Sequence, residues 1–282
     1  MRQFVPSPSF PELFAVIANP KSKTILDFDN VDQKEPKNVI LGPDISVLES
    51  SSNIHAPVRK RFQDFKSADW TWWEFEFHRC LREWHTFPKE SYDKMIKTIA
   101  WQWEGDAAAA KGMLEVVGCY INESACLEYE ARIADNEIVH ALTYANMVET
   151  SFADPGRVRA EILNSEQIRS RLLPVARALS AIARRGHEYR LGIAQDDIDT
   201  YSYGLLYEVI MYILEKLQFN PSFLMTHLLT SDGSFAPIAT AVQKIAVDEL
   251  NYHVPHRKYV IQNERETPRG QEAWRLLELP RP

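Results

Sequence analysis

The stretch Ala125–Val148, which contains neither glycine nor proline, constrains the fold more than any other feature of this sequence. Glycine and proline are the residues that most strongly interrupt helices, so a stretch of this length without either predicts one long helix. Glycine is scarce throughout, at 10 of 282 positions, which disfavours a turn-rich sandwich or barrel. We therefore expect an all-α fold.

Further helices are expected on both sides of this one. The turn residues Asp154-Pro155-Gly156 should close the long helix, and Asn220-Pro221 should kink or end a later one. The other predicted helical segments are Ser91–Glu104, Ala107–Ala110, Lys111–Val117, Glu166–Arg184, Ile198–Phe219 and Ile238–Asn251.

Prolines divide the chain into three regions. Residues 1–58 contain prolines at positions 6, 8, 11, 20, 36, 43 and 57. Because no helical period survives between them, we expect an extended N-terminal arm with one short strand at Lys23–Phe28. Residues 59–263 form the predicted helical domain. Residues 264–282 contain three more prolines and mixed charges, and we expect a flexible tail.

The composition excludes several classes of protein. The net charge is −7, so no basic field is available to bind a nucleic acid polymer. No apolar stretch is long enough for a membrane helix, and the N-terminus lacks the apolar region of a secretory leader. The three cysteines have no metal-binding spacing and fit a reducing compartment. We expect a cytoplasmic protein that is not bound to a membrane.

The long predicted helix contains a candidate pair of metal ligands. Glu137 and His140 are three residues apart and therefore lie on one helical face. Such pairs build dinuclear metal sites in four-helix bundles, together with further carboxylates from facing helices. The same spacing also arises by chance, as a surface glutamate and a boundary histidine. The pair alone favours that simpler interpretation.

The residues around this pair resemble the radical-generating small subunit of class I ribonucleotide reductase. In that family a tyrosine four residues after the histidine is oxidised to a stable radical, and Tyr144 has that place here. The family's first aspartate ligand, 31 positions before the glutamate, corresponds to Asp106. A pathway tryptophan lies 36 positions before that aspartate and corresponds to Trp70. The resemblance implies a ferritin-like helical bundle with a dinuclear metal site between its helices.

The second half of the chain resembles the same family more loosely. Asp248-Glu249 matches the family's Asp-Glu pair, and Glu215 lies 34 positions before Glu249. Phe219 and Phe223 follow Glu215 at the spacing of the two phenylalanines that line the family's radical pocket. The resemblance therefore implies metal ligation by Glu215 and Glu249. It also implies that Asp248 and Trp70 begin the electron-transfer route, and that Tyr144 holds the radical.

Glu208 is a weaker rival for the ligand role of Glu215. It lies in the segment Tyr207-Glu208-Val209-Ile210. We interpret Glu208 as a solvent-exposed helix charge.

The sixth ligand departs from the family pattern. The family's histidine would fall three residues after Glu249, where this chain has Tyr252. His253, at the next position, still shares a face with Glu249 and could ligate with a small helical adjustment such as a π-bulge. We expect His253 rather than His256 to be the ligand, because Pro255 disrupts the helix before His256.

Charge supplies a physical reason for metal. Four carboxylates that face one bundle interior would repel each other severely, whereas with two imidazoles they balance two divalent cations. Oxygen-rich ligation suits iron or manganese and excludes a thiolate zinc site. Two iron ions are the expected cofactor, and manganese is the open alternative. The predicted ligands are Asp106, Glu137, His140, Glu215, Glu249 and His253.

The resemblance further implies partners. A large catalytic subunit would use the radical to reduce ribonucleotides to deoxyribonucleotides, and the small subunit would form a homodimer. Residues Glu264–Pro282 would dock on the large subunit, and a flavoprotein activator is left open. The family's tail carries a relay tyrosine, whereas here only Tyr259 follows His253. The missing relay tyrosine bears on the long-range radical route to the large subunit more than on the metal site.

Two other classes of function stay open at this point. A ferritin-like di-metal oxidase or oxygenase could use the same ligands on a small organic substrate, and the short C-terminus and shifted histidine favour it slightly. An iron store, or a scaffold that has lost the site, would predict missing ligands. The combination of Tyr144, Trp70 and Asp248 favours the reductase subunit, because an oxygenase needs no radical store.

Overall fold

The computed structural model describes residues 21, 23–25, 38–42 and 54–279. No strand occurs among these residues, and their one β-type contact is an isolated bridge between Ile40 and Ile121. The all-α prediction is confirmed. Most of the expected N-terminal arm lies outside the described residues, as does half of the predicted strand at Lys23–Phe28, and residues 23–25 form no strand.

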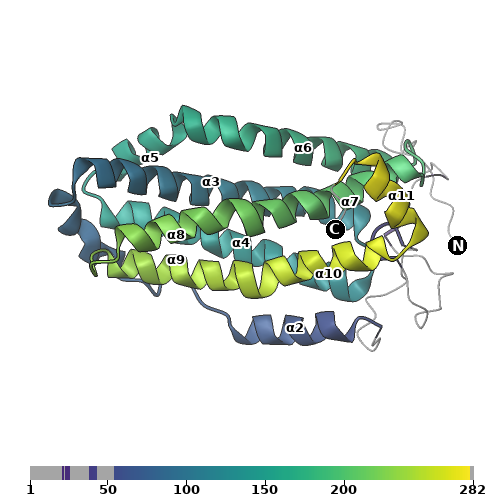
Figure 1. The fold of residues 1–282 in the computed structure, drawn as a ribbon, viewed down its shortest axis with the longest axis horizontal. Coiled ribbons are helices and arrows are strands. Elements are labelled where there is room, and N and C mark those ends of the chain that lie inside the picture. The colour runs from purple at the N-terminus through teal and green to yellow at the C-terminus, as the bar shows by residue number, and fades with distance from the viewer. Residues whose placement is uncertain (1–20, 22, 26–37, 43–53, 280–282) are drawn as a thin grey trace, which may run out of the picture.

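Long helices run lengthwise beside one another and enclose a common core (Figure 1). Helices α3 and α4 pack along each other, α6 covers α3, and the α7–α8 and α9–α10 runs complete the bundle. Helix α2 lies along one side against α4. The bounds are α2 Ala56–Ser67, α3 Lys89–Tyr120, α4 Ser124–Ser151, α5 Pro155–Leu163, α6 Glu166–Arg190, α7 Ile198–Ile213, α8 Asn220–Leu229, α9 Ala236–Asp248, α10 Val254–Arg265 and α11 Pro268–Leu276.

Helices α3 and α4 contain the segments that the sequence predicted as helical in the first half of the chain. Three predicted pieces join into the single helix α3, and the stretch without glycine or proline lies wholly inside α4. Asp154 caps the start of α5 by accepting the backbone N–H of Arg157, so the expected turn also begins a helix. One glycine in α3 has a packing role. A Cβ at Gly105 would lie 2.5 Å from the ring of Phe219.

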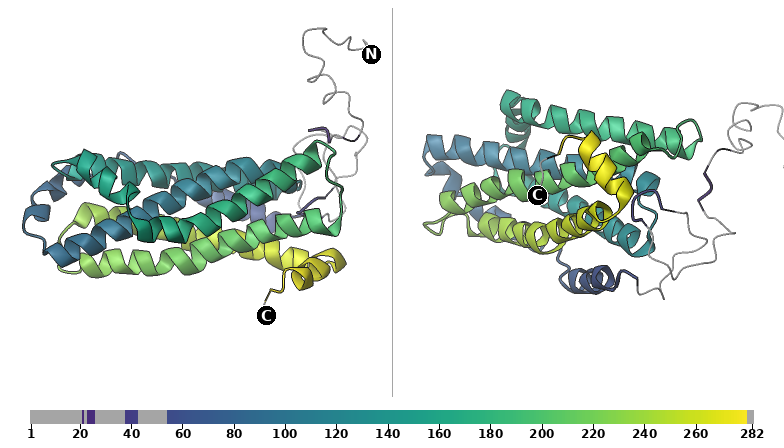
Figure 2. Two further views of the ribbon diagram at one scale, coloured as in Figure 1. Left: turned by 90° about the horizontal axis from the view of Figure 1, so that it is seen from above. Right: turned by 45° about the vertical axis from the view of Figure 1, so that its right-hand side comes forward.

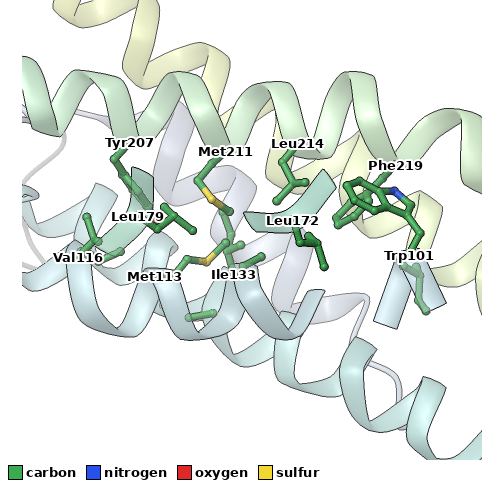
Figure 3. Packing of buried hydrophobic residues seen from close by; sticks show 14 of the residues in the cluster. Trp101, Met113, Val116, Ile133, Leu172, Leu179, Tyr207, Met211, Leu214 and Phe219 are labelled. Atoms are coloured by element: carbon green, nitrogen blue, oxygen red, sulfur yellow. The ribbon is translucent and has the colours of Figure 1, made fainter. Parts of the chain in front are cut away.

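Figure 3 shows the apolar core between these helices, where side chains such as Met113, Ile133, Leu179 and Met211 meet. These residues are fully buried or nearly so. Burial of the apolar faces of several helices against one another is the main source of stability for a bundle of this kind. None of the helices in the described part of the chain is long and apolar enough to cross a membrane.

Two short π-helical segments interrupt the second half of the bundle. Segment η3, Leu214–Phe219, joins α7 to α8, and segment η4, Glu249–His253, joins α9 to α10. Each precedes a proline near the start of the next helix, Pro221 in α8 and Pro255 in α10. The expected interruption before Pro221 is thus a change of helix type, and the chain continues in nearly the same direction (Figure 1). The π adjustment expected near His253 is present.

The C-terminal region differs from the flexible tail that we expected. Pro268–Leu276 forms helix α11, which turns back from α10 and packs against α7 and α10 (Figure 2). Thr267 caps this helix by accepting the backbone N–H of Gly270, and Ala273 is fully buried. Proline is favoured in the first turn of a helix, so Pro268 starts a helix here instead of preventing one.

Candidate metal centre

The six predicted ligands converge in the bundle interior. Their ligand atoms form two groups, and within each group the atoms lie within 4.8 Å of one another. Asp106, Glu137 and His140 form the smaller group. Glu137 belongs to both groups and would therefore bridge them. The larger group contains Glu137, Glu215, Glu249 and His253.

Four helical elements supply these side chains. Asp106 comes from α3, and Glu137 and His140 come from α4, one turn apart. Glu215 lies in η3, and Glu249 and His253 are the first and last residues of η4. Residues four apart share a helical face, and Glu249 and His253 are the two buried residues of η4. π segments are rare and occur frequently at functional sites.

The six side chains are buried without enough hydrogen-bond partners. None is more than 1% exposed. Both carboxylate oxygens of Asp106, Glu137 and Glu249 lack a hydrogen bond, as does one oxygen of Glu215. The Nδ1 atoms of His140 and His253 are also unpartnered. Buried polar atoms are nearly always satisfied in proteins, so this concentration of unpartnered ligand atoms fits a site for metal ions.

Hydrogen bonds orient the two histidines. His140 Nε2 lies 3.2 Å from Asp248 Oδ2, and His253 Nε2 lies 2.8 Å from Asn136 Oδ1. Both Nε2 atoms therefore donate outward, and both Nδ1 atoms face the carboxylates. His140 Nδ1 is 3.5 Å from Glu249 and His253 Nδ1 is 3.1 Å from the same residue. A ligand histidine held through its other nitrogen is the usual arrangement in metal sites.

Asn136 is a residue that the sequence analysis missed. Its side chain accepts from His253 and donates to Asp248 Oδ2 at 3.0 Å, so it links the two histidine supports. Asn136 lies four residues before His140 and therefore on the same face of α4. That spacing was the one available signal, but an asparagine inside a helix has many other roles.

The charges in this cluster explain why a cation fits it. Burial and the nearby Glu137 raise the pKa of Asp106 well above its usual value. Burial also raises the pKa of Glu215, to about 8. For His253, burial lowers the pKa, but Glu249 and Glu137 outweigh it and raise the pKa to about 10. Without metal, these groups must share protons, and metal ions would replace those protons.

Tyr144 is completely buried in α4, one turn beyond His140, and its hydroxyl has no hydrogen-bond partner. Burial, and then the negative charges of Asp106 and Glu249, raise its pKa well above the usual value. Phe219 and Phe223 are also buried, and their ring centroids are 6.0 Å apart. Their roles as walls of a radical pocket stay a prediction.

Trp70 is connected to the buried cluster by hydrogen bonds. Its indole N–H donates to Asp248 Oδ2 at 2.7 Å, and the same oxygen accepts from His140. The rings of Trp70 and His140 are stacked with centroids 5.8 Å apart. Tyr259 is the last tyrosine of the chain, 11 residues after Asp248. Its hydroxyl lies 2.8 Å from His55 Nδ1.

The two rival ligands lie in neither metal group. Glu208 is fully buried and accepts from Arg257 at 3.4 Å, so its interpretation as a solvent-exposed charge was wrong. His256 Nε2 lies 2.9 Å from Glu130. Both belong to a second set of buried polar residues, which we call the Arg257 layer. It consists of Glu130, Tyr207, Glu208, His256 and Arg257.

The Arg257 layer was not predicted from the sequence. Glu130 and Glu208 each precede a predicted ligand by seven residues, or two helical turns, and Arg257 follows His253 by four. These spacings place the layer next to the metal groups along the bundle. The sequence signal is weak, because charged residues at such positions usually face solvent.

Comparisons with known proteins support the fold. No protein-family model matches the chain. No curated protein matches it either. Among solved structures, the ribonucleotide reductase R2 subunit from Clostridium botulinum matches with a TM-score of 0.70 and 15% identity. The match covers 91% of this chain and 78% of that one. A putative class I ribonucleotide reductase from Bacillus halodurans matches with a TM-score of 0.63 and 15% identity, covering 91% and 79%.

At 15% identity these matches show the fold and nothing further. The chain has the same helical bundle architecture as the R2 subunit, which confirms the predicted ferritin-like fold class.

Proposed function

We propose that this protein is the small subunit of a class I ribonucleotide reductase and that it holds two metal ions. The observation that carries this proposal is the pair of buried groups that share Glu137 and have unpartnered ligand atoms, inside a bundle with the R2 fold. Oxygen-rich ligation favours iron, with manganese as the alternative. The partner would be a large catalytic subunit. A homodimer, a flavoprotein activator and a cytoplasmic location also belong to this proposal.

The side chains of this chain suggest how the activity would work. Asp106, Glu137, His140, Glu215, Glu249 and His253 would hold the ions, which supply one-electron oxidising power after reaction with dioxygen. Tyr144 would lose an electron and its phenolic proton and store the radical in the dry interior. His140, Asp248 and Trp70 form a hydrogen-bonded chain by which an electron could be exchanged with the large subunit.

The proposal is tested by electron paramagnetic resonance after loading metal-free protein with Fe²⁺ and exposing it to oxygen. A tyrosyl signal is expected in the wild type and not in Tyr144→Phe, which should still fold and bind two ions. With the large subunit present, Tyr144→Phe should not support ribonucleotide reduction. Protein that binds no metal would refute the proposal. A Tyr144→Phe variant with full activity would show that another group holds the oxidising equivalent.

The alternative, a ferritin-like oxidase or oxygenase, uses the same ligands but needs no connection to Trp70. Trp70→Phe distinguishes the two functions. It should abolish ribonucleotide reduction while the tyrosyl signal of the loaded protein persists. Oxidation of a small substrate that continues unchanged in Trp70→Phe, without any reductase activity in the wild type, would favour the alternative.

A further inference from the structure

Glu215 differs from the other predicted carboxylate ligands. Asp106, Glu137 and Glu249 have two unpartnered oxygens each, whereas Glu215 has one. Its other oxygen, Oε1, lies 3.4 Å from Nε of Arg257. Glu215 is therefore the one carboxylate of the six-residue set, among the contacts described, that is paired with an arginine.

Arg257 is held in place by groups other than Glu215. Its side chain is fully buried, and its Nη1 donates to Glu130 and, at 3.4 Å, to Glu208. Its Nη2 lies 3.6 Å from the sulfur of Met113, and the ring of Tyr207 lies 5.2 Å from the guanidinium carbon. Because several neighbours determine the position of Arg257, it is Arg257 that constrains Glu215 and not the reverse.

Arginine keeps its positive charge in essentially any protein environment, and its planar fork directs N–H donors along defined directions. A carboxylate oxygen that accepts from such a donor is less available to a metal ion. A fixed positive charge also repels a divalent cation nearby, and this repulsion is strong where water is excluded. Both effects act on the group that contains Glu215. The group of Asp106, Glu137 and His140 has no arginine or lysine among its described contacts.

We propose that Arg257 is a positioning residue that limits Glu215 to ligation through Oε2 and weakens binding of one of the two metal ions. This inference rests on the proposed two-metal site. It makes the two ion positions unequal through a residue that is itself no ligand. The affected ion is the one held by Glu137, Glu215, Glu249 and His253.

The test is a titration of metal-free protein with Mn²⁺ without oxygen, in which the free ion is measured by electron paramagnetic resonance. The wild type is compared with the double variant Glu130→Gln/Arg257→Met, which removes one buried charge of each sign. One of the two binding steps should tighten by at least about tenfold in the double variant, and the other should change little. An anomalous scattering map at one Mn²⁺ per chain identifies which position has tightened.

Two control variants separate this effect from general disturbance of the layer. Tyr207→Phe removes the hydrogen bond to Glu130 but leaves the contact between Arg257 and Glu215, so both binding steps should stay as in the wild type. Arg257→Lys keeps the positive charge. The affected binding step should therefore stay almost as weak in this variant as in the wild type. A double variant that binds both ions as the wild type does would overturn the proposal.

A measurement on the wild type alone keeps the proposal testable if the double variant does not fold. In crystals of the Mn²⁺-loaded protein, Glu215 should contact the metal through one oxygen while Arg257 retains the other. Two oxygens of Glu215 on the metal would contradict the proposal. Wild-type protein that binds no Mn²⁺ would instead refute the proposed function, so the two failures are distinguishable.

Discussion

Two neighbouring layers of buried polar residues in this bundle differ in how many of their polar atoms lack a hydrogen-bond partner. The six predicted ligands have nine unpartnered ligand atoms among them. Their one described contact with an arginine or lysine is that of Glu215 with Arg257. In the Arg257 layer, Arg257 pairs with Glu130 and Glu208, and Glu130 also accepts from Tyr207 at 3.0 Å. Three polar atoms of this layer lack a hydrogen bond, namely Glu208 Oε1 and the two ring nitrogens of His256. Both layers are fully buried.

The difference shows how a buried cluster that binds a ligand can be distinguished from one that stabilises the fold. A structural cluster satisfies most of its own charges and hydrogen bonds, because unpaired buried charges are costly. A metal-binding cluster leaves ligand atoms unpaired in the protein and relies on the ion to compensate. On this criterion the first layer fits the proposed metal site, and the Arg257 layer fits a structural role.

The strongest test of the comparison replaces one histidine from each layer. His253→Ala should remove at least one of the two metal ions, because it deletes a ligand whose Nδ1 faces Glu249 and Glu137. The expected loss of affinity exceeds the roughly 10–100-fold cost of losing an outer-shell partner. His256→Ala should keep both ions. Metal content after gel filtration measures the effect, and equal loss in both variants would contradict the distinction.

The second test breaks the Arg257 layer. Arg257→Met leaves Glu130 and Glu208 as uncompensated buried acids, and breaking a buried pair in this way costs about 3–5 kcal/mol. The loss should appear in the free energy of unfolding of metal-free protein, measured with urea. Adding Glu130→Gln should recover much of it, because no unpaired charge of that pair then remains. If Arg257→Met unfolds like the wild type, the layer does not stabilise the bundle.

Removing one charge from the six predicted ligands should have the opposite effect on the free energy of unfolding of metal-free protein. Asp106→Asn removes one of several crowded acids, neither of whose oxygens has a hydrogen-bond partner. Metal-free Asp106→Asn should therefore be more stable than the wild type, by about 0.5–2 kcal/mol, as is common when a functional site is relieved of strain. Its metal binding should weaken at the same time. A less stable metal-free variant would show that Asp106 is satisfied in solution.

The smallest expected effect concerns acid stability. Burial raises the pKa of Glu130, but Arg257 and His256 outweigh it and lower the pKa to about 2 from the usual 4.5. A lowered pKa in the folded state stabilises the protein above the unfolded pKa, and that contribution is lost as the pH falls from 4.5 towards 2. Glu130→Gln should therefore flatten the fall of the unfolding free energy over this range.

Glu208→Gln is the matched control for that measurement. Burial and the charge of Glu130 raise the pKa of Glu208 well above its usual value. A group with a raised pKa does not contribute to stability that is lost at acid pH. In Glu208→Gln the free energy of unfolding should thus fall with decreasing pH as steeply as in the wild type. The same flattening in both variants would show that the charge of Glu130 is not the cause.

Much of this molecule is predictable from residue spacing. The helices follow from long stretches without glycine or proline, and Glu137 and His140 share a face because helical geometry is local. Glu249 and His253 are four residues apart and also share a face, and the π adjustment expected beside them is present as η4. Family resemblance added Asp106, Trp70 and Tyr144 at long spacings, and all three are placed in or beside the buried cluster.

Errors arose where a residue has its role through distant contacts. Glu208 looked like a surface charge because its own helix says nothing about the buried guanidinium that faces it from α10. The prolines and mixed charges of residues 264–282 led us to expect a flexible tail, whereas Pro268 lies in the first turn of α11, where proline is favoured. Asn136 has its role through hydrogen bonds to Asp248 and His253, which are far from it in the sequence.

The sequence by itself determined the helical class, the helix in which each candidate ligand lies and the face on which neighbouring ligands meet, because backbone propensity and helical periodicity act over a few residues. Only the tertiary structure decided which charges are satisfied. The contact of Arg257 with Glu215 spans 42 positions, and its contact with Glu130 spans 127. Such pairs depend on how whole helices pack, and no local spacing reveals whether a buried carboxylate faces an arginine or other carboxylates that need a metal.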